Sequence, residues 1–249
     1  MADGNNGLNM HDPTIGFPVS NSMCATFNEQ LSFLEGYAIA TEGKDLNLQC
    51  ILVPAMNLHR NPLCGRYAEY FSEDPYLAGR MAGKESEGIE AAGASSVMKH
   101  FIANNAENHR SRNQSFLSER AMRELYLKVF EIAIETHMPD AVMTGYNPAN
   151  GCWCAGDEEL LEGILREEWD FSGYVMTDWG STHCCPSVPT VQSGNCWIAP
   201  GCMDDSLPNE IVEGIKQGVV DRERIRANVR DMYGTIARRL RVKKSSNGK

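Results

Sequence analysis

Polar and charged side chains stand where short apolar runs of this chain end. Lys99 and His100 close one run, Tyr146 closes a second, and Asp178 with Trp179 follows a third. A Lys-His pair at the end of an apolar strand is costly to bury unless both groups find partners, so a purely structural role for it is disfavoured. An indole beside a carboxylate offers an apolar face on which sugar C–H groups can stack. These residue types therefore indicate chemistry on a hydroxyl-rich substrate.

The charges around Asp178 suggest its role. If Lys99, His100 and Arg66 lie near this carboxylate, their positive charge is expected to lower its pKa and hold it ionised. An ionised carboxylate suits a nucleophile better than a general acid. The sequence thus predicts Asp178 as a nucleophile ringed by basic neighbours.

Two of these residues have structural alternatives that the sequence leaves open. Asp178 could cap the helix that follows it. Arg66 could pair with Glu69 or Glu73 and so fix the following loop.

The elements that must position these residues alternate in the pattern of βα units around a parallel sheet. Strands are expected at 49–56, 95–101, 141–146, 174–176 and, more weakly, 195–198, with helices at 74–90, 118–137, 157–169, 209–217 and 221–241. In such a barrel the carboxyl ends of the strands face one pocket, and a closed (β/α)8 barrel needs eight strands. The predicted fold class is α/β, an incomplete (β/α)8 TIM-type barrel that lacks its first strands.

One domain is expected over residues 1–241, followed by a basic tail at 242–249 that we expect to be disordered. The basic residues around 238–244 could bind nucleic acid or a membrane, but a solvated end is the simpler interpretation. The last helix carries apolar residues at helical spacing, which are expected to face the core. They are Ile225, Val229, Met232, Ile236 and Leu240.

Composition restricts partners and cofactors. The chain has 33 acidic and 23 basic side chains, a formal charge of -10 that would repel a nucleic acid. No apolar run approaches about 18 residues, so neither a membrane span nor a signal peptide is expected. We expect a cytoplasmic protein, or a secreted one if a signal precedes Met1. The nine cysteines match neither a zinc spacing nor a disulfide scaffold, so reduced thiols, no metal site and no cofactor are expected.

Several segments resemble the signature segments of glycoside hydrolase family 3, in the family's order and at family-like spacing. They are 57–66, 69–76, 99–101, 118–124, 142–147 and 176–180. The resemblance implies a β-glucosidase-like enzyme whose barrel domain binds the non-reducing sugar. It also implies that Asp178, in the Thr-Asp-Trp segment, is the nucleophile.

The resemblance assigns roles to six further residues. It implies that Arg66, Lys99 and His100 hold sugar hydroxyls and that Tyr146 sits beside the nucleophile. Trp179 would lie beside the sugar, and Asp3 would bind a distal hydroxyl. Two departures stand out: Asn9 replaces an expected arginine, and the segment 181–189 contains two prolines that are expected to remodel the rim beside Trp179.

The implied mechanism is a double displacement with retention, acting on a β-glucoside or short oligosaccharide. A second carboxylic acid should then stand about 5–5.5 Å from Asp178. In many family members this acid/base is a Glu on a separate α/β sandwich domain, so a C-terminal domain or second chain is expected to supply it. His109 is a less favoured acid/base candidate, by analogy with a subgroup that cleaves N-acetylglucosaminides. The alternative function is a catalytically incomplete sugar-binding fragment or pseudoenzyme.

Overall fold

A five-stranded parallel sheet forms the centre of the protein, which we describe with a computed structural model covering residues 1–10, 13–202 and 204–246. Its strands are β1 (Ala2–Asp3), β2 (Cys50–Leu52), β3 (Ser95–Phe101), β4 (Ala141–Thr144) and β7 (Tyr174–Met176). They pair in the order β1-β2-β3-β4-β7, which is their order along the chain. A wall of parallel strands in chain order, with helices between them, is part of an α/β barrel. The predicted fold class is therefore confirmed.

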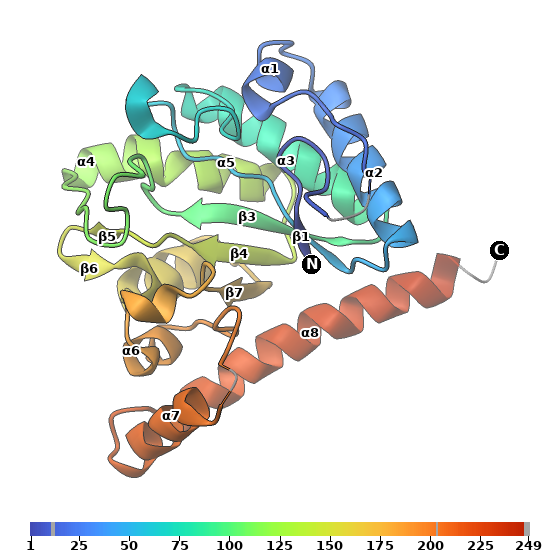
Figure 1. Cartoon of the computed structure of the whole chain (residues 1–249). Helices are drawn as coiled ribbons and strands as arrows, with labels where there is room; N and C mark the ends of the chain where they lie inside the picture. Colours follow the sequence, from blue (N-terminus) through green and yellow to red (C-terminus); the bar gives the residue numbers. More distant parts are fainter. Residues whose placement is uncertain (11–12, 203, 247–249) are drawn as a thin grey trace.

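The strands are buried on both faces, as parallel strands covered by helices must be. Successive residues alternate between two cores: Met98 and Val142 pack in the larger core beneath the helices, whereas Val97 and Met143 pack on the other face. Figure 1 shows α2, α3 and α5 on one side of the sheet and α8 crossing the other side. We call the face beneath α2, α3 and α5 the outer face of the sheet and the opposite face the inner face.

The outer face is covered by α2 (Glu29–Asp45), α3 (Pro75–Ala91) and α5 (Lys128–Thr136). Asp74 caps α3 by accepting hydrogen bonds from the backbone of residues 76 and 77, and Pro75 supplies the first helical position. Helices α2 and α3 pack closely because glycines stand at their contact. A Cβ atom on Gly36 would lie 2.2 Å from the carbonyl oxygen of Glu85, so this close approach requires glycine.

Several element boundaries differ from those expected. The strand predicted at 49–56 is limited to β2, and the segment 195–198 makes only one bridge, between Trp197 and Met176 of β7. The helix predicted at 118–137 is divided into α4 (Glu119–Ala121), the π-helical η2 (Met122–Tyr126) and α5. The helix predicted at 157–169 is η4 (Glu159–Glu168), also π-helical.

The remaining elements are short or lie near the C-terminal end. They are α1 (Ser20–Cys24), η1 (Pro62–Cys64), the hairpin β5 (Pro148–Ala149) with β6 (Cys152–Trp153), η3 (Cys154–Gly156), η5 (Ser181–His183), α6 (Ser187–Gln192), α7 (Ser206–Lys216) and α8 (Arg222–Ser246). Neither β1 nor α2 was predicted. Helix α8 continues through 242–246 of the expected tail, and residues 247–249 lie outside the described part of the chain.

The prediction that the apolar stripe of α8 faces the core is confirmed only for Met232, which packs against the cluster that contains Tyr174 and Met176. Val229, Ile236 and Leu240 are 48%, 46% and 57% exposed. The buried side chains of α8 include Asn228, which donates to the carbonyl oxygens of Val191 and Asn195. Helix α8 is thus held both by Met232 and by polar contacts such as those of Asn228.

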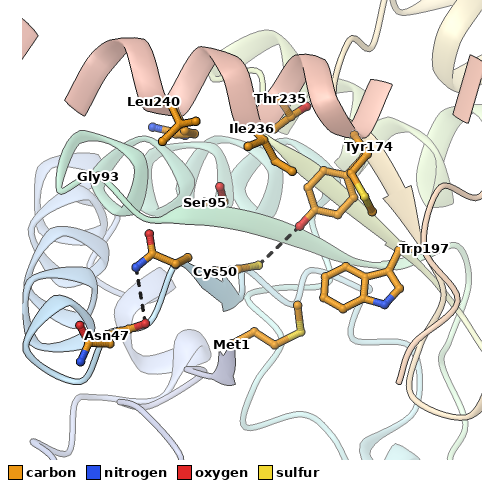
Figure 2. A pocket seen from close by; sticks show the side chains of 13 residues that line it. Met1, Asn47, Cys50, Gly93, Ser95, Tyr174, Trp197, Thr235, Ile236 and Leu240 are labelled. Atoms are coloured by element: carbon orange, nitrogen blue, oxygen red, sulfur yellow. Dashed lines mark hydrogen bonds between the residues drawn. The ribbon is translucent and has the colours of Figure 1, made fainter. Parts of the chain in front are cut away.

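A cavity of about 450 Å³ lies between α8 and the N-terminal ends of the strands. Figure 2 shows Tyr174 and Trp197 from the sheet side facing Ile236 and Leu240 of α8 across it. The Tyr174 hydroxyl lies 3.7 Å from the Cys50 sulfur. No disulfide joins the cysteines, and no helix among the described residues is long and apolar enough to cross a membrane.

Candidate active site

A second cavity, of about 490 Å³, lies at the carboxyl ends of the strands. We call it the strand-end pocket. All seven predicted site residues line it, namely Asp3, Arg66, Lys99, His100, Tyr146, Asp178 and Trp179. They come from five separate parts of the chain, so their meeting is a property of the barrel topology.

Strand β3 supplies Lys99 and His100, both of which are almost completely buried. The register between β3 and β4 shifts between Lys99 and Phe101, a local irregularity of the kind that re-aims side chains. Asn57, which follows β2, donates to the carbonyl oxygen of His100 at 2.8 Å and accepts from its backbone N–H at 2.9 Å. Asn57 thus fixes the backbone from which the His100 side chain projects.

Lys99 forms an ion pair with Asp3, with its Nζ 2.6 Å from Oδ1. The Lys99 side chain is only 4% exposed, whereas that of Asp3 is 51% exposed. A buried ammonium group needs such a partner, because burying it unpaired would destabilise the fold by on the order of several kcal/mol. Asp3 therefore brings the end of β1 into the pocket and leaves part of its carboxylate open to the cavity.

Asp178 lies just beyond β7 and is 8% exposed. Its Oδ1 accepts a hydrogen bond from the backbone N–H of Trp179 at 2.7 Å. Its Oδ2 is buried without a hydrogen-bond partner and lies 3.5 Å from Nε2 of His100. One oxygen is thus anchored by the backbone, and the other remains unsatisfied.

The pKa of Asp178 is raised above its ordinary value, so the predicted lowering is wrong. Burial is the largest cause, and it outweighs the opposing effects of the Trp179 N–H, Lys99 and Arg66. His100 does not add a positive charge, because burial, together with Arg66 and Lys99, holds its pKa well below the usual range. The prediction counted three cations and omitted the cost of removing the carboxylate from water.

Tyr146 and Trp179 form the wall beside Asp178. The Tyr146 hydroxyl donates to the carbonyl oxygen of Trp179 at 2.5 Å, and burial raises the pKa of this phenol. This hydrogen bond ties the end of β4 to the residue after the carboxylate. The Trp179 side chain remains 48% exposed, so part of its indole is available for contact with a ligand.

Arg66 fulfils the structural alternative and still reaches the pocket. Its guanidinium forms a two-pronged ion pair with Glu69, including Nη2 to Oε2 at 3.1 Å. The same Nη2 lies 3.1 Å from Nε2 of His100. Glu73 takes no part in this pairing. The two roles considered for Arg66 are therefore compatible.

The pocket also contains residues that the sequence reasoning did not select. Arg110 lies in the loop after β3, and its Cζ is 4.3 Å from the centre of the Tyr146 ring. No strand end marks Arg110 in the sequence, so only the folded loop brings it to the pocket. Asn9, noted as a departure from the expected arginine, also lines the wall, together with Met1, Ala2, Met10, Leu52 and Met143.

Two expectations about the rim can be compared with the structure. His109, the alternative acid/base, is absent from the lining of the strand-end pocket. The proline-containing segment after Trp179 folds as η5 and α6, with Pro186 preceding α6. Among the described residues, no group of three or more His, Cys, Asp and Glu side chains is arranged to hold a metal ion.

Comparisons with known proteins agree with this architecture. The sequence model for the Glycosyl hydrolase family 3 N terminal domain matches residues 2–199. A β-glucosidase of Ruminococcus albus is 44% identical over 180 residues, covering 72% of this chain and 19% of that protein. An exo-α-(1→6)-L-arabinopyranosidase of Bifidobacterium longum is 37% identical over 213 residues, covering 85% and 28%.

A solved structure is similar over nearly the whole chain. β-Glucosidase 3B from Thermotoga neapolitana, in complex with α-D-glucose, aligns with a TM-score of 0.88 and 38% identity, covering 94% of this chain and 35% of that one. This chain therefore spans from about a fifth to about a third of the length of these relatives.

Proposed function

Because the chain belongs to glycosyl hydrolase family 3, we propose that it forms the sugar-binding barrel of a retaining β-glucosidase-like enzyme with Asp178 as its nucleophile. One observation carries the proposal. The Oδ2 atom of Asp178 is buried in the strand-end pocket without a hydrogen-bond partner. Such an orphaned oxygen is costly unless a bound group uses it.

In the proposed reaction, Asp178 attacks the anomeric carbon of a terminal β-glucosyl residue through Oδ2. The bond from that carbon to the aglycone oxygen breaks, and a covalent glycosyl-enzyme forms. Water then attacks the same carbon, releases Asp178 and yields a sugar with net retention. The Trp179 N–H bonded to Oδ1 fixes the orientation of the carboxylate throughout.

The remaining pocket residues would bind the sugar. Lys99 and Arg66 place donors in the pocket, and the exposed part of the Asp3 carboxylate can accept hydrogen bonds from a hydroxyl pair. Neutral His100 can donate or accept, depending on its tautomer. The open part of the Trp179 indole would stack against sugar C–H groups.

The proposed acid/base lies outside the pocket described here. Asp3 and Asp178 are the carboxylates among the lining residues, and Asp3 is already paired with Lys99. A group that protonates the leaving oxygen must reach the reacting centre from elsewhere. We therefore propose that a further domain or a partner chain supplies it.

Glucose is the sugar that we propose for the pocket, on the basis of the β-glucosidases among its relatives and the glucose-bound Thermotoga neapolitana structure. The Bifidobacterium longum relative, named for an arabinopyranoside, makes this pentoside the alternative to test. Both sugars are pyranosides, but they differ at two ring carbons: the arabinopyranoside lacks the hydroxymethyl group of glucose and has the opposite configuration at the C4 hydroxyl.

Covalent trapping tests the nucleophile. The intact chain would be incubated with a 2-deoxy-2-fluoro-β-glucoside carrying a dinitrophenolate leaving group, which needs little acid assistance. Peptide mass mapping should then find the label on Asp178. A label on another carboxylate would overturn the assignment, and no label with either the glucoside or the arabinopyranoside would argue against a glycosidase.

A catalytically incomplete sugar-binding barrel is the second candidate. The lack of an unpaired second carboxylate among the described lining residues favours it. An aryl β-glucoside distinguishes the two functions: a stoichiometric burst followed by slow turnover indicates a reactive Asp178 without its acid partner. Glucose binding without a burst would indicate the sugar-binding function.

A further inference from the structure

One carboxylate, that of Glu107, joins two arginines of the strand-end pocket. Its Oε2 lies 2.8 Å from Nη1 of Arg110, and its Oε1 lies 3.6 Å from Nη1 of Arg66. These arginines come from different loops, one after β2 and the other after β3. Glu107 itself does not line the pocket, so its contacts with the pocket are made through them.

The Glu107 side chain is fixed independently of the arginines. Buried Asn104 donates to its Oε1 at 3.2 Å, and the backbone N–H of Glu107 donates to the carbonyl oxygen of Cys64 at 3.3 Å. Gly65 has a φ of +90°, a conformation that other residues rarely adopt, and a Cβ atom there would lie 3.7 Å from the Cβ and Cγ of Glu107. Glu107 thus has contacts besides those with its two cationic partners.

The two arginines differ in how they are held. Arg66 has a second acidic partner, Glu69, whereas Glu107 is the acidic partner of Arg110 among the described residues. Arg110 in turn lies over the Tyr146 ring, next to Asp178. Losing the charge of Glu107 would therefore affect Arg110 more than Arg66.

We propose that Glu107 is a positioning residue that holds Arg66 and Arg110 along one wall of the strand-end pocket. This inference rests on the proposed function for its catalytic meaning, but the electrostatic arrangement can be tested without turnover. No described contact joins Glu107 to Asp178, so its influence passes through the two arginines and through space.

The sign of the expected change follows from the charges that face Asp178. These groups are Lys99, His100, Arg66, Arg110, Tyr146, Asp3 and Cys184. If Glu107 holds the arginines, replacing it by a neutral residue releases them from the pocket wall, and the loss of their positive charge raises the pKa of Asp178. If Glu107 does not position the arginines, they stay in place, and the pKa of Asp178 falls or stays unchanged.

A carbon-13 titration of aspartate carboxyl groups in the intact chain measures this directly. For Glu107→Gln we expect the pKa of Asp178 to rise by about half a pH unit, because the arginines that favour the ionised carboxylate are no longer held beside it. A fall or no change would overturn the proposal. Glu124→Gln, which breaks an exposed ion pair with Arg120, is the matched control and should leave the Asp178 titration unchanged.

Glu107→Asp keeps the charge but shortens the reach to both arginines, and it serves if the glutamine variant does not fold. We expect glucose to bind roughly 3- to 10-fold more weakly to it, since the shorter side chain weakens the charged hydrogen bonds that hold the two arginines. Unaltered glucose affinity would overturn the proposal. Failure of the proposed function is a separate outcome, because it is the absence of any fluorosugar label in the unmodified chain.

Discussion

The two ends of the same parallel strands carry two cavities of similar size and opposite character. The cavity at the strand starts is lined largely by apolar groups, including Tyr174, Trp197 and Ile236 (Figure 2). The strand-end pocket instead contains ion pairs and a buried carboxylate. Both cavities are large enough to hold a small ligand, so cavity volume does not distinguish a reactive site from a gap in packing.

The difference lies in which polar groups are satisfied. At the strand starts, Arg239 is paired with Glu90 and Asp140 and anchors α8 to the sheet. In the strand-end pocket, Oδ2 of Asp178 and Nδ1 of His100 are buried without hydrogen-bond partners. Unsatisfied buried groups cost stability, and a substrate that completes their hydrogen bonds recovers part of that cost.

Replacing Asp178 by alanine tests whether the strand-end pocket is the reactive one of the two cavities. We expect Asp178→Ala to reduce labelling and aryl glucoside turnover by at least about a thousandfold, as removal of a nucleophile does. Since the unpartnered oxygen adds little to folding, the melting temperature should stay close to that of the parent chain. Rate measurements together with thermal unfolding check this, and a large loss of folded protein would indicate a structural role instead.

Replacing Tyr174 tests the opposite end of the strands. Tyr174→Ala removes a buried aromatic ring beside the cavity and should lower the free energy of unfolding by about 3 kcal/mol. Urea unfolding measures this loss. The Asp178 labelling rate should be nearly unchanged in the folded variant, and Tyr174→Phe should lose much less stability. A labelling defect without a stability defect would reverse the roles assigned to the two cavities.

Lys99→Ala tests how the charge of Lys99 affects Asp178 in the strand-end pocket. Removing this cation should raise the pKa of Asp178 further, because an opposing charge that favours the ionised form is lost. The acidic limb of the labelling rate should move to higher pH, and glucose should bind roughly 10- to 100-fold more weakly, given about 1.5–3 kcal/mol for a charged hydrogen bond. Lys84→Ala, on a half-buried ion pair with Glu87 away from the strand-end pocket, is the control. An unmoved acidic limb would contradict the proximity argument.

A buried acid away from both cavities provides a reference for Asp178. Burial raises the pKa of Glu35, between α2 and α3, to about 7, and no cation opposes that shift. A raised folded-state pKa means that stability present below the unfolded pKa is lost as pH rises toward about 7. Glu35→Gln should therefore gain stability relative to the parent between about pH 4.5 and pH 7, by about 1–2 kcal/mol. Urea unfolding at pH 5 and pH 7.5 checks this, and equal differences at both pH values would contradict it.

The amino-acid sequence determined the βα alternation and the residues at the strand ends. Apolar runs of strand length predicted β3 and β7 to the residue, because a buried parallel strand needs nearly continuous apolar side chains. The polar residues just after such runs then had to meet in one pocket, as Lys99 and Asp178 do. The resemblance to glycoside hydrolase family 3 was confirmed by the family match over residues 2–199.

Features that depend on neighbours distant in sequence could be seen only in the tertiary structure. Helix α2 was missed because its apolar residues do not form a clear stripe, and its packing depends on glycines that contact α3. Which side of α8 is exposed depends on where the helix packs. Arg110 lines the pocket only because its loop folds over Tyr146. The direction of the Asp178 pKa shift reversed for the same reason: opposing charges can be counted in a sequence, but desolvation exists only once the chain has folded around the carboxylate.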